Sequence, residues 1–277
     1  MQATDTAAAE RTTWDRVVID LAAGERPAAD LPRRLATGDV PVVVLRGLLP
    51  AEAVTENLAR LQPLFGTART TEYANGSLTT VGPYLAKYLD DPDGYFAAAK
   101  SADALLGDVG FDLGERIRGA LREALGLRAL DPAREPDGRE YAPFVVRIHA
   151  DGVRNPLHND NIMRDAAGTG IVLEGLSHQL SCVVCLQECN GGGELGIYRK
   201  PWAPDDERFK ISGGLGYDSG VVEGVPGHRF RPAAGDVYLL NPTQYHEIAR
   251  VSGDTRLTLG FFLGFPDDRL DTAVVWG

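Results

Sequence analysis

The second half of the chain is a series of short apolar segments separated by turn-forming residues. Between residues 140 and 265 the segments are rich in β-branched and aromatic residues, which favour strands. Many short strands joined by turns predict a sandwich or a closed barrel. In chain order, the segments are APFVVRIHA, HQLSCVVCLQEC, GELGIYRK, GHRFRPAAGDVYLLN, YHEIARV and TRLTLGFFLGF.

The first half of the chain shows helical spacing instead. Apolar residues recur at helical intervals in AEAVTENLARLQPLF (51–65) and DLGERIRGALREALG (112–126), and a shorter helix is expected in GYFAAAKSADALLG (94–107). The polar segment GTARTTEYANGSLTT (66–80) is typical of a loop with room for a hairpin. In contrast, VPVVVLRGLL (40–49) predicts a buried strand.

These patterns predict one α+β domain over residues 1–277, with helices packed on the outside of a β core. No internal repeat is evident. The expected parts are a mobile tail (1–10), mainly helical support (11–139), the β core (140–265) and a C-terminal tail (266–277).

Charge and hydropathy exclude several classes of partner. The formal net charge of −11 argues against nucleic acid or an anionic membrane surface, because either would favour clustered Lys and Arg. The most apolar segments are interrupted well before the roughly 20 residues that cross a bilayer. The N-terminal sequence MQATDTAAAERTTWDR lacks the apolar core of a secretory signal, so a cytoplasmic location is expected. The oligomeric state stays open.

Three cysteines lie close together in CVVCLQEC. With His178 just upstream, Cys182, Cys185 and Cys189 offer four soft ligands for zinc. However, LSCVVCLQ is typical of a buried strand, and its alternation puts Cys182 and Cys185 on opposite faces. We therefore interpret these cysteines as core residues.

A different set of residues has the composition of an iron site. In PLHNDNIMRD, His158 and Asp160 stand at positions i and i+2, which point to the same side of an extended segment. His246 lies further along the chain. Two histidines and one carboxylate form the facial triad of non-haem Fe(II) oxygenases, which leaves open positions on the metal.

Arg256 and Thr258 follow His246 at short intervals. If residues 252–254 form a hairpin loop, His246, Arg256 and Thr258 share the inward face, and Arg250 turns inward as a rival to Arg256. A buried arginine is costly unless it meets an anion, and a carboxylate suits its planar fork. The pair Arg256 and Thr258 is therefore the candidate anion site.

These five residues together resemble the Fe(II)/2-oxoglutarate-dependent oxygenases. GGGELGIYRK and AAGDVYLLNP also look like strand motifs found between the two histidines in that superfamily. The resemblance implies a double-stranded β-helix, or jelly-roll, core over residues 140–265 with supporting N-terminal helices. It is nearest to stand-alone enzymes that act on free small molecules, including amino-acid hydroxylases and related halogenases.

The resemblance also implies roles. His158, Asp160 and His246 would bind Fe(II), and Arg256 with Thr258 would hold the distal carboxylate of 2-oxoglutarate. The reaction would consume O2 and release succinate and CO2. Halogenases of this superfamily have Gly or Ala at the position of the carboxylate ligand, so Asp160 predicts hydroxylation, with desaturation or cyclisation as variants.

The sequence constrains the substrate least. We expect a small molecule, an amino acid or its N-acyl derivative, because basic residues lie near the site. The candidate contacts are Arg147, His149, Asn161 and Arg164; Arg147 and His149 share a face, which lines either the pocket or a salt-bridged barrel rim. The alternatives are a protein or peptide hydroxylase, a non-catalytic ligand-binding barrel, and a different metal enzyme on a cupin-like barrel.

One long segment inside the β half is rich in glycine. KISGGLGYDSGVVEGVPG (210–227) contains six glycines, and a loop of this length in a compact domain is often functional. We expect it to close over the substrate, with Tyr217, Val221 and Val222 making the apolar contacts of the closed lid. The alternative is a solvent-exposed insertion.

Overall fold

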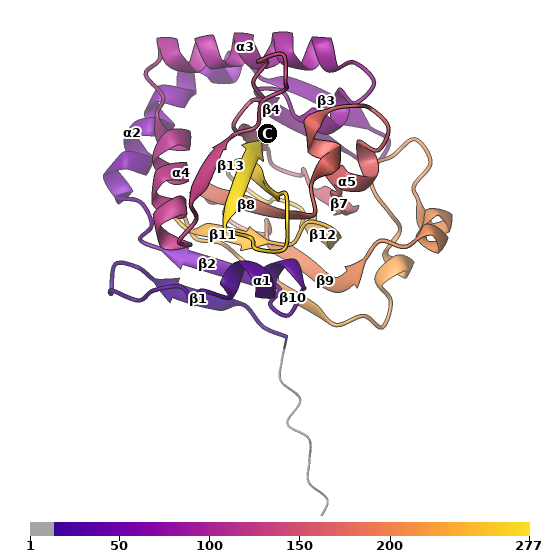
Figure 1. Cartoon of the computed structure of the whole chain (residues 1–277). Helices are drawn as coiled ribbons and strands as arrows, with labels where there is room; N and C mark the ends of the chain where they lie inside the picture. Colours follow the sequence, from indigo (N-terminus) through magenta and orange to yellow (C-terminus); the bar gives the residue numbers. More distant parts are fainter. Residues whose placement is uncertain (1–13) are drawn as a thin grey trace, which may run out of the picture.

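Two β-sheets form the centre of the molecule, and helices lie around the larger one (Figure 1). The computed structural model describes residues 14–277, so the tail expected at residues 1–10 lies outside the described residues. The arrangement confirms the predicted mixture of helices and multi-stranded sheets.

The larger sheet has ten strands within residues 14–277. Its main path runs β1-β2-β11-β8-β13-β6-β4-β3, while β14 pairs with β13 and β5 pairs with β14. β1 and β2 are parallel, as are β14 and β5, and the other neighbours are antiparallel. The bounds are β1 (Val17–Asp20), β2 (Val42–Arg46), β3 (Arg69–Tyr73), β4 (Gly76–Val81), β5 (Ala129–Pro132), β6 (Val145–His149), β8 (His178–Gln187), β11 (Val237–Leu240), β13 (Arg256–Phe265) and β14 (Thr272–Trp276).

The smaller sheet is antiparallel and runs β10-β9-β12-β7. Its strands are β7 (Asn155–His158), β9 (Leu195–Pro201), β10 (Gly227–Phe230) and β12 (Gln244–Ile248). Side chains of the two sheets share one buried cluster, in which the ring of Phe230 meets that of Tyr238 edge to face at 5.4 Å. The two sheets therefore pack face to face. The cluster comprises Val42, Val44, Val183, Leu195, Ile197, Phe230, Tyr238, Leu240 and Ile248.

The helices cover the outer face of the larger sheet. Leu113, Ile117 and Leu121 recur every four residues along α4 and are buried in one cluster with side chains of β8 and β13, as amphipathic spacing requires. The α-helices are α1 (Leu31–Ala36), α2 (Ala51–Leu61), α3 (Pro92–Asp108), α4 (Leu113–Ala124) and α5 (Ile162–Asp165). Short 3-10 helices are η1 (Gln62–Thr67), η2 (Leu85–Lys87), η3 (Val172–Gly175), η4 (Pro204–Phe209) and η5 (Ser219–Val222).

Two of the expected helices differ from the sequence prediction. The helix expected over 51–65 gives way to a 3-10 turn after Leu61, because Pro63 has no N–H with which to continue the helical hydrogen bonds. The helix expected to be short is α3, with 17 residues. The Asp91 side chain accepts a bond from Gly94 N, and Pro92 occupies the first turn, so α3 begins earlier than its apolar pattern indicates.

The parts at the two ends also contribute more strand than expected. Residues 11–139, predicted to be mainly helical, supply β1 to β5 of the larger sheet. The segment 266–277, predicted to be a tail, contains β14, and Trp276 is 1% exposed. β14 lies between β13 and the distant β5, and β3 is a polar strand of a hairpin. Neither strand therefore has the alternation of apolar and polar residues from which strands are predicted.

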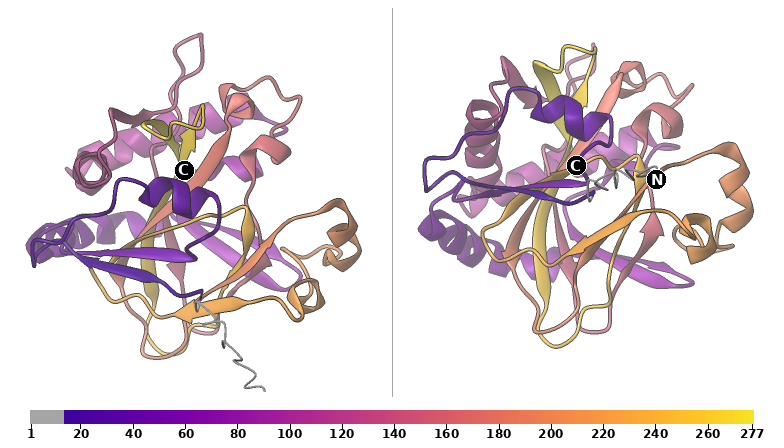
Figure 2. Two further views of the ribbon diagram at one scale, coloured as in Figure 1. Left: turned by 60° about the horizontal axis from the view of Figure 1, so that its bottom comes forward. Right: turned by 90° about the horizontal axis from the view of Figure 1, so that it is seen from below.

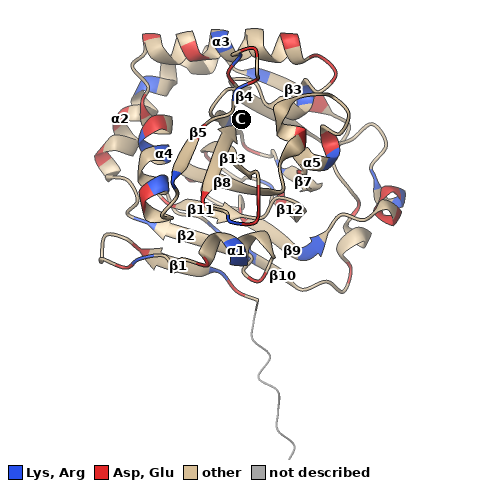
Figure 3. Cartoon of the chain, in the orientation of Figure 1, with Lys and Arg blue, Asp and Glu red and all other residues tan. Residues whose placement is uncertain are grey.

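Charged side chains of both signs are interspersed on α2, α3 and α4 (Figure 3). None of the helices within residues 14–277 combines the length and apolar character that a membrane crossing requires. The cytoplasmic location stays a prediction.

Candidate metal centre and its two cavities

The three candidate metal ligands come from two neighbouring strands and the loop that follows one of them. His158 ends β7, and His246 lies directly opposite it on β12. Asp160 comes just after β7, where its N–H donates to the carbonyl oxygen of Pro242 at 2.8 Å. This backbone bond ties the loop to the chain that leads into β12, so the carboxylate stays beside both imidazoles.

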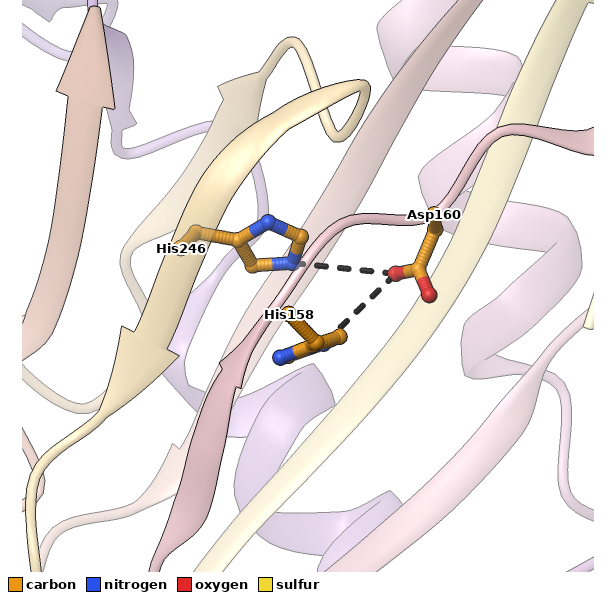
Figure 4. A group of neighbouring side chains, drawn as sticks. All are labelled: His158, Asp160 and His246. Atoms are coloured by element: carbon orange, nitrogen blue, oxygen red, sulfur yellow. Dashed lines mark ion pairs between the residues drawn. The ribbon is translucent and has the colours of Figure 1, made fainter. Parts of the chain in front are cut away.

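The ligand atoms converge (Figure 4). Asp160 Oδ2 lies 3.7 Å from His158 Nε2 and 3.6 Å from His246 Nε2, and the two ring centroids are 4.2 Å apart. One ligand atom from each residue lies within 4.8 Å of the others. Across residues 14–277 no other group of His, Cys, Asp and Glu is gathered this closely.

Backbone carbonyls fix the tautomer of both histidines. Nδ1 of His158 lies 2.7 Å from the Pro156 oxygen, and Nδ1 of His246 lies 3.0 Å from the Gln244 oxygen. A carbonyl only accepts, so each Nδ1 carries the proton and each Nε2 presents a lone pair to Asp160. Burial, with His158 next to it, lowers the pKa of His246 to about 4, so this imidazole is neutral at pH 7. Two imidazoles with Nε2 directed at the site and one carboxylate fit non-haem Fe(II).

An inner cavity of about 60 Å³ opens beside the ligands, between the sheets. Four of its lining residues come from two adjacent strands: Arg256 is paired with His149, and Thr258 with Arg147, across β13 and β6. Arg256 is 3% exposed and Thr258 1%. Asp160 is the one carboxylate among the described residues that line this cavity.

The two arginines of the inner cavity lack anionic partners. Arg256 donates from Nη2 to the hydroxyl of Tyr238 at 3.0 Å, and the part of the chain described here offers Arg147 no side-chain hydrogen bond or ion pair. Burial lowers the pKa of Arg147 from its ordinary value, because the nearby Asp160 carboxylate offsets only part of the cost of desolvating this cation. Gly260 of β13 makes room for Arg147, since a Cβ there would lie 2.0 Å from Nη1. The cavity therefore presents positive charge to an anion that the protein does not supply.

His149 also faces the inner cavity without a partner. It is 2% exposed, and neither ring nitrogen has a hydrogen bond within residues 14–277. Burial, followed by the charges of Arg256 and Arg147, lowers the pKa of His149 to about 3, so its ring is neutral. The salt-bridged rim considered for Arg147 and His149 is wrong, because neither side chain has an ion pair within the described residues.

A larger outer cavity of about 250 Å³ is also lined by two of the metal ligands, His158 and Asp160. It shares Arg147, Asn155, His158, Asp160 and Phe262 with the inner cavity, so the two cavities adjoin at the candidate metal centre. Its wall is largely apolar and aromatic, with a few polar groups between. The other lining residues are Tyr73, Leu78, Tyr84, Leu85, Ala86, Lys87, Leu89, Asn161, Ile162, Asp165, Gln179, Leu215 and Trp276.

The predicted substrate contacts separate in the structure. Arg147 and Asn161 line the outer cavity, whereas His149 lines only the inner one. Arg164 lines neither: it donates to Asp165 Oδ1 at 2.6 Å and to Asn159 Oδ1 at 2.7 Å, and its guanidinium stacks over Trp202. The structure therefore does not bring Arg164 to the site.

The hairpin used to orient Arg256 is wrong, although the orientation itself is right. β12 and β13 lie in different sheets, so residues 252–254 connect the sheets instead of closing a hairpin. Arg256 turns inward because β13 runs between β6 and β8 in the larger sheet. Arg250, expected inward as a rival, is exposed and donates to the Gly152 oxygen.

The cysteines form no metal site. All three are buried and unpaired thiols, and burial raises the pKa of Cys182 and Cys185, the latter to about 11. Cys182 packs into the helix-covered core. Within the described residues no cysteine belongs to a group of converging ligands, which agrees with the interpretation as core residues.

The glycine-rich segment 210–227 is packed and is not an extended insertion. It projects at the side of the molecule (Figure 2) and is fixed near its middle, where Tyr217 N donates to the Leu157 oxygen at 2.8 Å. Tyr217, Val221 and Val222 are buried in a cluster with Leu157 and Tyr245. These side chains anchor the segment instead of covering the outer cavity; Leu215 is the residue of this segment that lines the cavity.

Several residues of the site give little signal in the sequence. Tyr238, Asn155 and Gln179 sit in strands as ordinary polar or aromatic residues, and Phe262 and Trp276 look like core residues. All four residues of β11 are buried, and strand periodicity indicates only that Tyr238 and Leu240 share one face of the strand.

Comparison with known proteins agrees with this class of site. The resemblance to the Fe(II)/2-oxoglutarate-dependent oxygenases is confirmed, since a family model matches nearly the whole described chain. The model, for the carrier-protein-independent halogenase WelO5, matches residues 19–277, and the chain belongs to this family.

Individual relatives are more distant. The chain is 30% identical to an L-gamma-glutamyl-L-propargylglycine hydroxylase of Streptantibioticus cattleyicolor over 63% of each protein. It is 30% identical to an L-isoleucine 3(1)-dioxygenase of Pantoea ananatis over 50% of this chain and 48% of that protein. The fold is similar to that of an N-substituted L-amino acid dioxygenase from Burkholderia ambifaria, with a TM-score of 0.59, 16% identity, and coverage of 90% and 91% of the two chains.

Proposed function

We propose that the chain is an Fe(II)- and 2-oxoglutarate-dependent oxygenase that hydroxylates an unactivated C–H bond of a small molecule, an amino acid or an amino-acid derivative. One observation carries the proposal: two lone-pair nitrogens and a carboxylate oxygen converge beside a buried, arginine-lined cavity that lacks an anion. The two packed sheets then correspond to the double-stranded β-helix of that superfamily.

The proposed roles follow from the position of each side chain. His158, Asp160 and His246 hold Fe(II), which when bound couples the oxidative decarboxylation of 2-oxoglutarate by O2 to oxidation of the substrate. The balance is one C–H substrate, one O2 and one 2-oxoglutarate giving the alcohol, succinate and CO2. The two imidazoles need no proton release to bind the metal, because their Nε2 atoms already carry lone pairs.

The inner cavity is the proposed site of the co-substrate. The fork of Arg256 binds the distal carboxylate, Tyr238 orients the guanidinium, and Thr258 adds a hydroxyl donor. We assign His149 to the same carboxylate and not to the substrate, since this residue lines the inner cavity alone. In its neutral form it donates one N–H.

Hydroxylation is proposed in preference to halogenation. Although the matching family model is named after a halogenase, Asp160 supplies a carboxylate oxygen at the position that halogenases leave to chloride. Two relatives with a similar sequence are named as a hydroxylase and a dioxygenase of amino-acid substrates. A cavity volume of about 250 Å³ is near the lower end of small-molecule sites, which favours a metabolite over a protein substrate.

The test is metal-dependent formation of succinate. Anaerobic addition of Fe(II) and 2-oxoglutarate should give the visible absorption of a chelated 2-oxo acid, and air with a panel of small acids should yield succinate. His246→Ala should lose both signals, whereas Arg250→Ala, on the exposed side of the same chain segment, should keep them. Undiminished succinate formation by His246→Ala would refute the proposal.

A further inference from the structure

The outer cavity has no carboxylate free to bind a cation. Two acidic residues line it, and both are engaged. Asp160 is directed at the two imidazoles. Asp165 accepts from Arg164 Nε at 2.6 Å through Oδ1 and from Asn161 N at 3.4 Å through Oδ2. A ligand with an ammonium group would therefore find no partner of opposite charge among the described residues of the wall.

The same wall offers unused hydrogen-bond donors and positive charge. Arg147 has no anionic partner, as described above. Lys87, which also lines the cavity, is exposed and donates to a hydroxyl, Thr71 Oγ1, at 3.0 Å. Arg147 and Lys87 therefore carry positive charges that neither lining carboxylate pairs with, since Asp160 is directed at the imidazoles and Asp165 at Arg164.

Gln179 supplies a further donor whose orientation is certain. Its Oε1 lies 2.8 Å from the N–H of Ile162, and an N–H can bond only to the amide oxygen. The Nε2 group, a donor, is therefore the end of the amide left for a ligand. Gln179 is 3% exposed and lines the outer cavity, so an acceptor of the ligand must meet this donor or leave it unsatisfied.

From this inventory we infer that the substrate is an acid whose nitrogen is acylated, such as an N-acyl amino acid, and not a free zwitterionic amino acid. Its carboxylate meets Arg147, its acyl carbonyl oxygen accepts from Gln179, and its hydrocarbon part lies against Leu85, Phe262 and Trp276. A free ammonium would be desolvated beside cations with no carboxylate to pair with, which is strongly unfavourable. The inference rests on the proposed function and deepens it.

The test compares matched pairs of ligands. L-leucine, L-isoleucine and L-phenylalanine are each compared with their N-acetyl derivatives by calorimetric titration of the anaerobic protein loaded with Fe(II) and 2-oxoglutarate. The acetylated acids should bind at least about tenfold more tightly than the free amino acids. The N-acetyl carboxamides, which lack the carboxylate, should bind weakly. Equal or tighter binding of the free amino acids overturns the inference. Absence of binding by both the free and the acetylated forms also overturns it.

A charge substitution makes the test specific to the cavity wall. Gln179→Glu keeps an oxygen for Ile162 N and replaces the free donor by a carboxylate, so the preference for acetylated ligands should fall or reverse. Gln62→Glu introduces the same charge on an exposed residue outside the cavity and should leave the preference unchanged. An unchanged preference in Gln179→Glu contradicts the inference. The absorption band and succinate formation test the proposed function separately, since neither depends on which ligand is preferred.

Discussion

Arg256 lies directly opposite His149 on neighbouring antiparallel strands, and both side chains face the inner cavity. Arg256 is a permanent cation that donates to the hydroxyl of Tyr238. The imidazole of His149 is kept neutral by burial and by the charge of Arg256. A neutral donor beside an arginine fork suits a carboxylate, because the histidine adds a hydrogen bond without adding a second desolvated charge.

We expect His149→Leu to weaken binding of 2-oxoglutarate by about tenfold or more, since a hydrogen bond to a charged group contributes roughly 1.5–3 kcal/mol. Stability should not fall, because the substitution removes two buried nitrogens that lack partners. Titration of the visible band with 2-oxoglutarate and thermal unfolding of the metal-free protein measure the two effects. If the KM for the organic substrate rises instead and that for 2-oxoglutarate does not, His149 belongs to the substrate site.

Arg256→Lys should raise the KM for 2-oxoglutarate by about two orders of magnitude although the charge is kept, since a lysine has no bidentate fork and loses the geometry set by Tyr238. Arg250→Lys is the matched control, because Arg250 is exposed and bonds only to a backbone oxygen. Similar kinetic changes in both variants would show that Arg256 has no special role.

Chloride should not alter the product of the unmodified protein, because the Asp160 carboxylate fills the third ligand position. We expect only oxygenated product by mass spectrometry, with or without chloride at high concentration. Asp160→Gly should lose most of its iron affinity and activity. A chlorinated product from the unmodified protein would refute the assignment of Asp160.

Stability of the metal-free protein should depend on pH between about 6.5 and 4. Burial lowers the folded pKa of His246 to about 4 and that of His149 to about 3, so the unfolded chain, with ordinary values near 6.5, binds more protons in this range. The contribution of these histidines to the free energy of unfolding is therefore largest above pH 6.5 and decreases as the pH falls below it. In His149→Leu the slope should be smaller by about 1.4 kcal/mol per pH unit, measured by denaturant unfolding with a chelator present. Identical slopes would contradict the burial argument.

The segment 210–227 should become less ordered when its contact with the β3–β4 turn is removed. Asn75 donates from Nδ2 to the Leu215 oxygen and accepts from Leu215 N through Oδ1, each at 2.8 Å. In Asn75→Ala, hydrogen exchange of residues 213–216 should accelerate and the KM for the substrate should rise, because Leu215 lines the outer cavity. In the unmodified protein, iron, 2-oxoglutarate and substrate together should slow this exchange. Exchange that is unaffected by substrate would exclude a covering role.

The candidate site was predictable from the sequence because its signals are chemical. Histidine is rare in this chain, with five residues in all, and the structure brings His158, Asp160 and His246 together. The inward orientation of Arg256 was predicted correctly, but from a hairpin that does not exist. Which face of β13 is inward depends on the strands that flank it, and the sequence alone does not show that β12 belongs to another sheet. β14 and β5 were missed for a related reason: their pairing partners lie far away in the chain. The outer cavity gathers residues from across the chain, from Tyr73 to Trp276, which no local pattern can assemble.

The way in which His158 and His246 are oriented bears on how this scaffold can diversify. Each imidazole is held by a carbonyl of its own strand, two residues earlier, and this contact does not involve the apolar side chains of the outer cavity. Those side chains come from other segments, among them Leu78, Leu85 and Leu215. Substitutions at these three positions should therefore change which substrate binds without changing the positions of the metal ligands. A library of variants at these positions can be screened for new substrates while the metal-binding geometry is preserved.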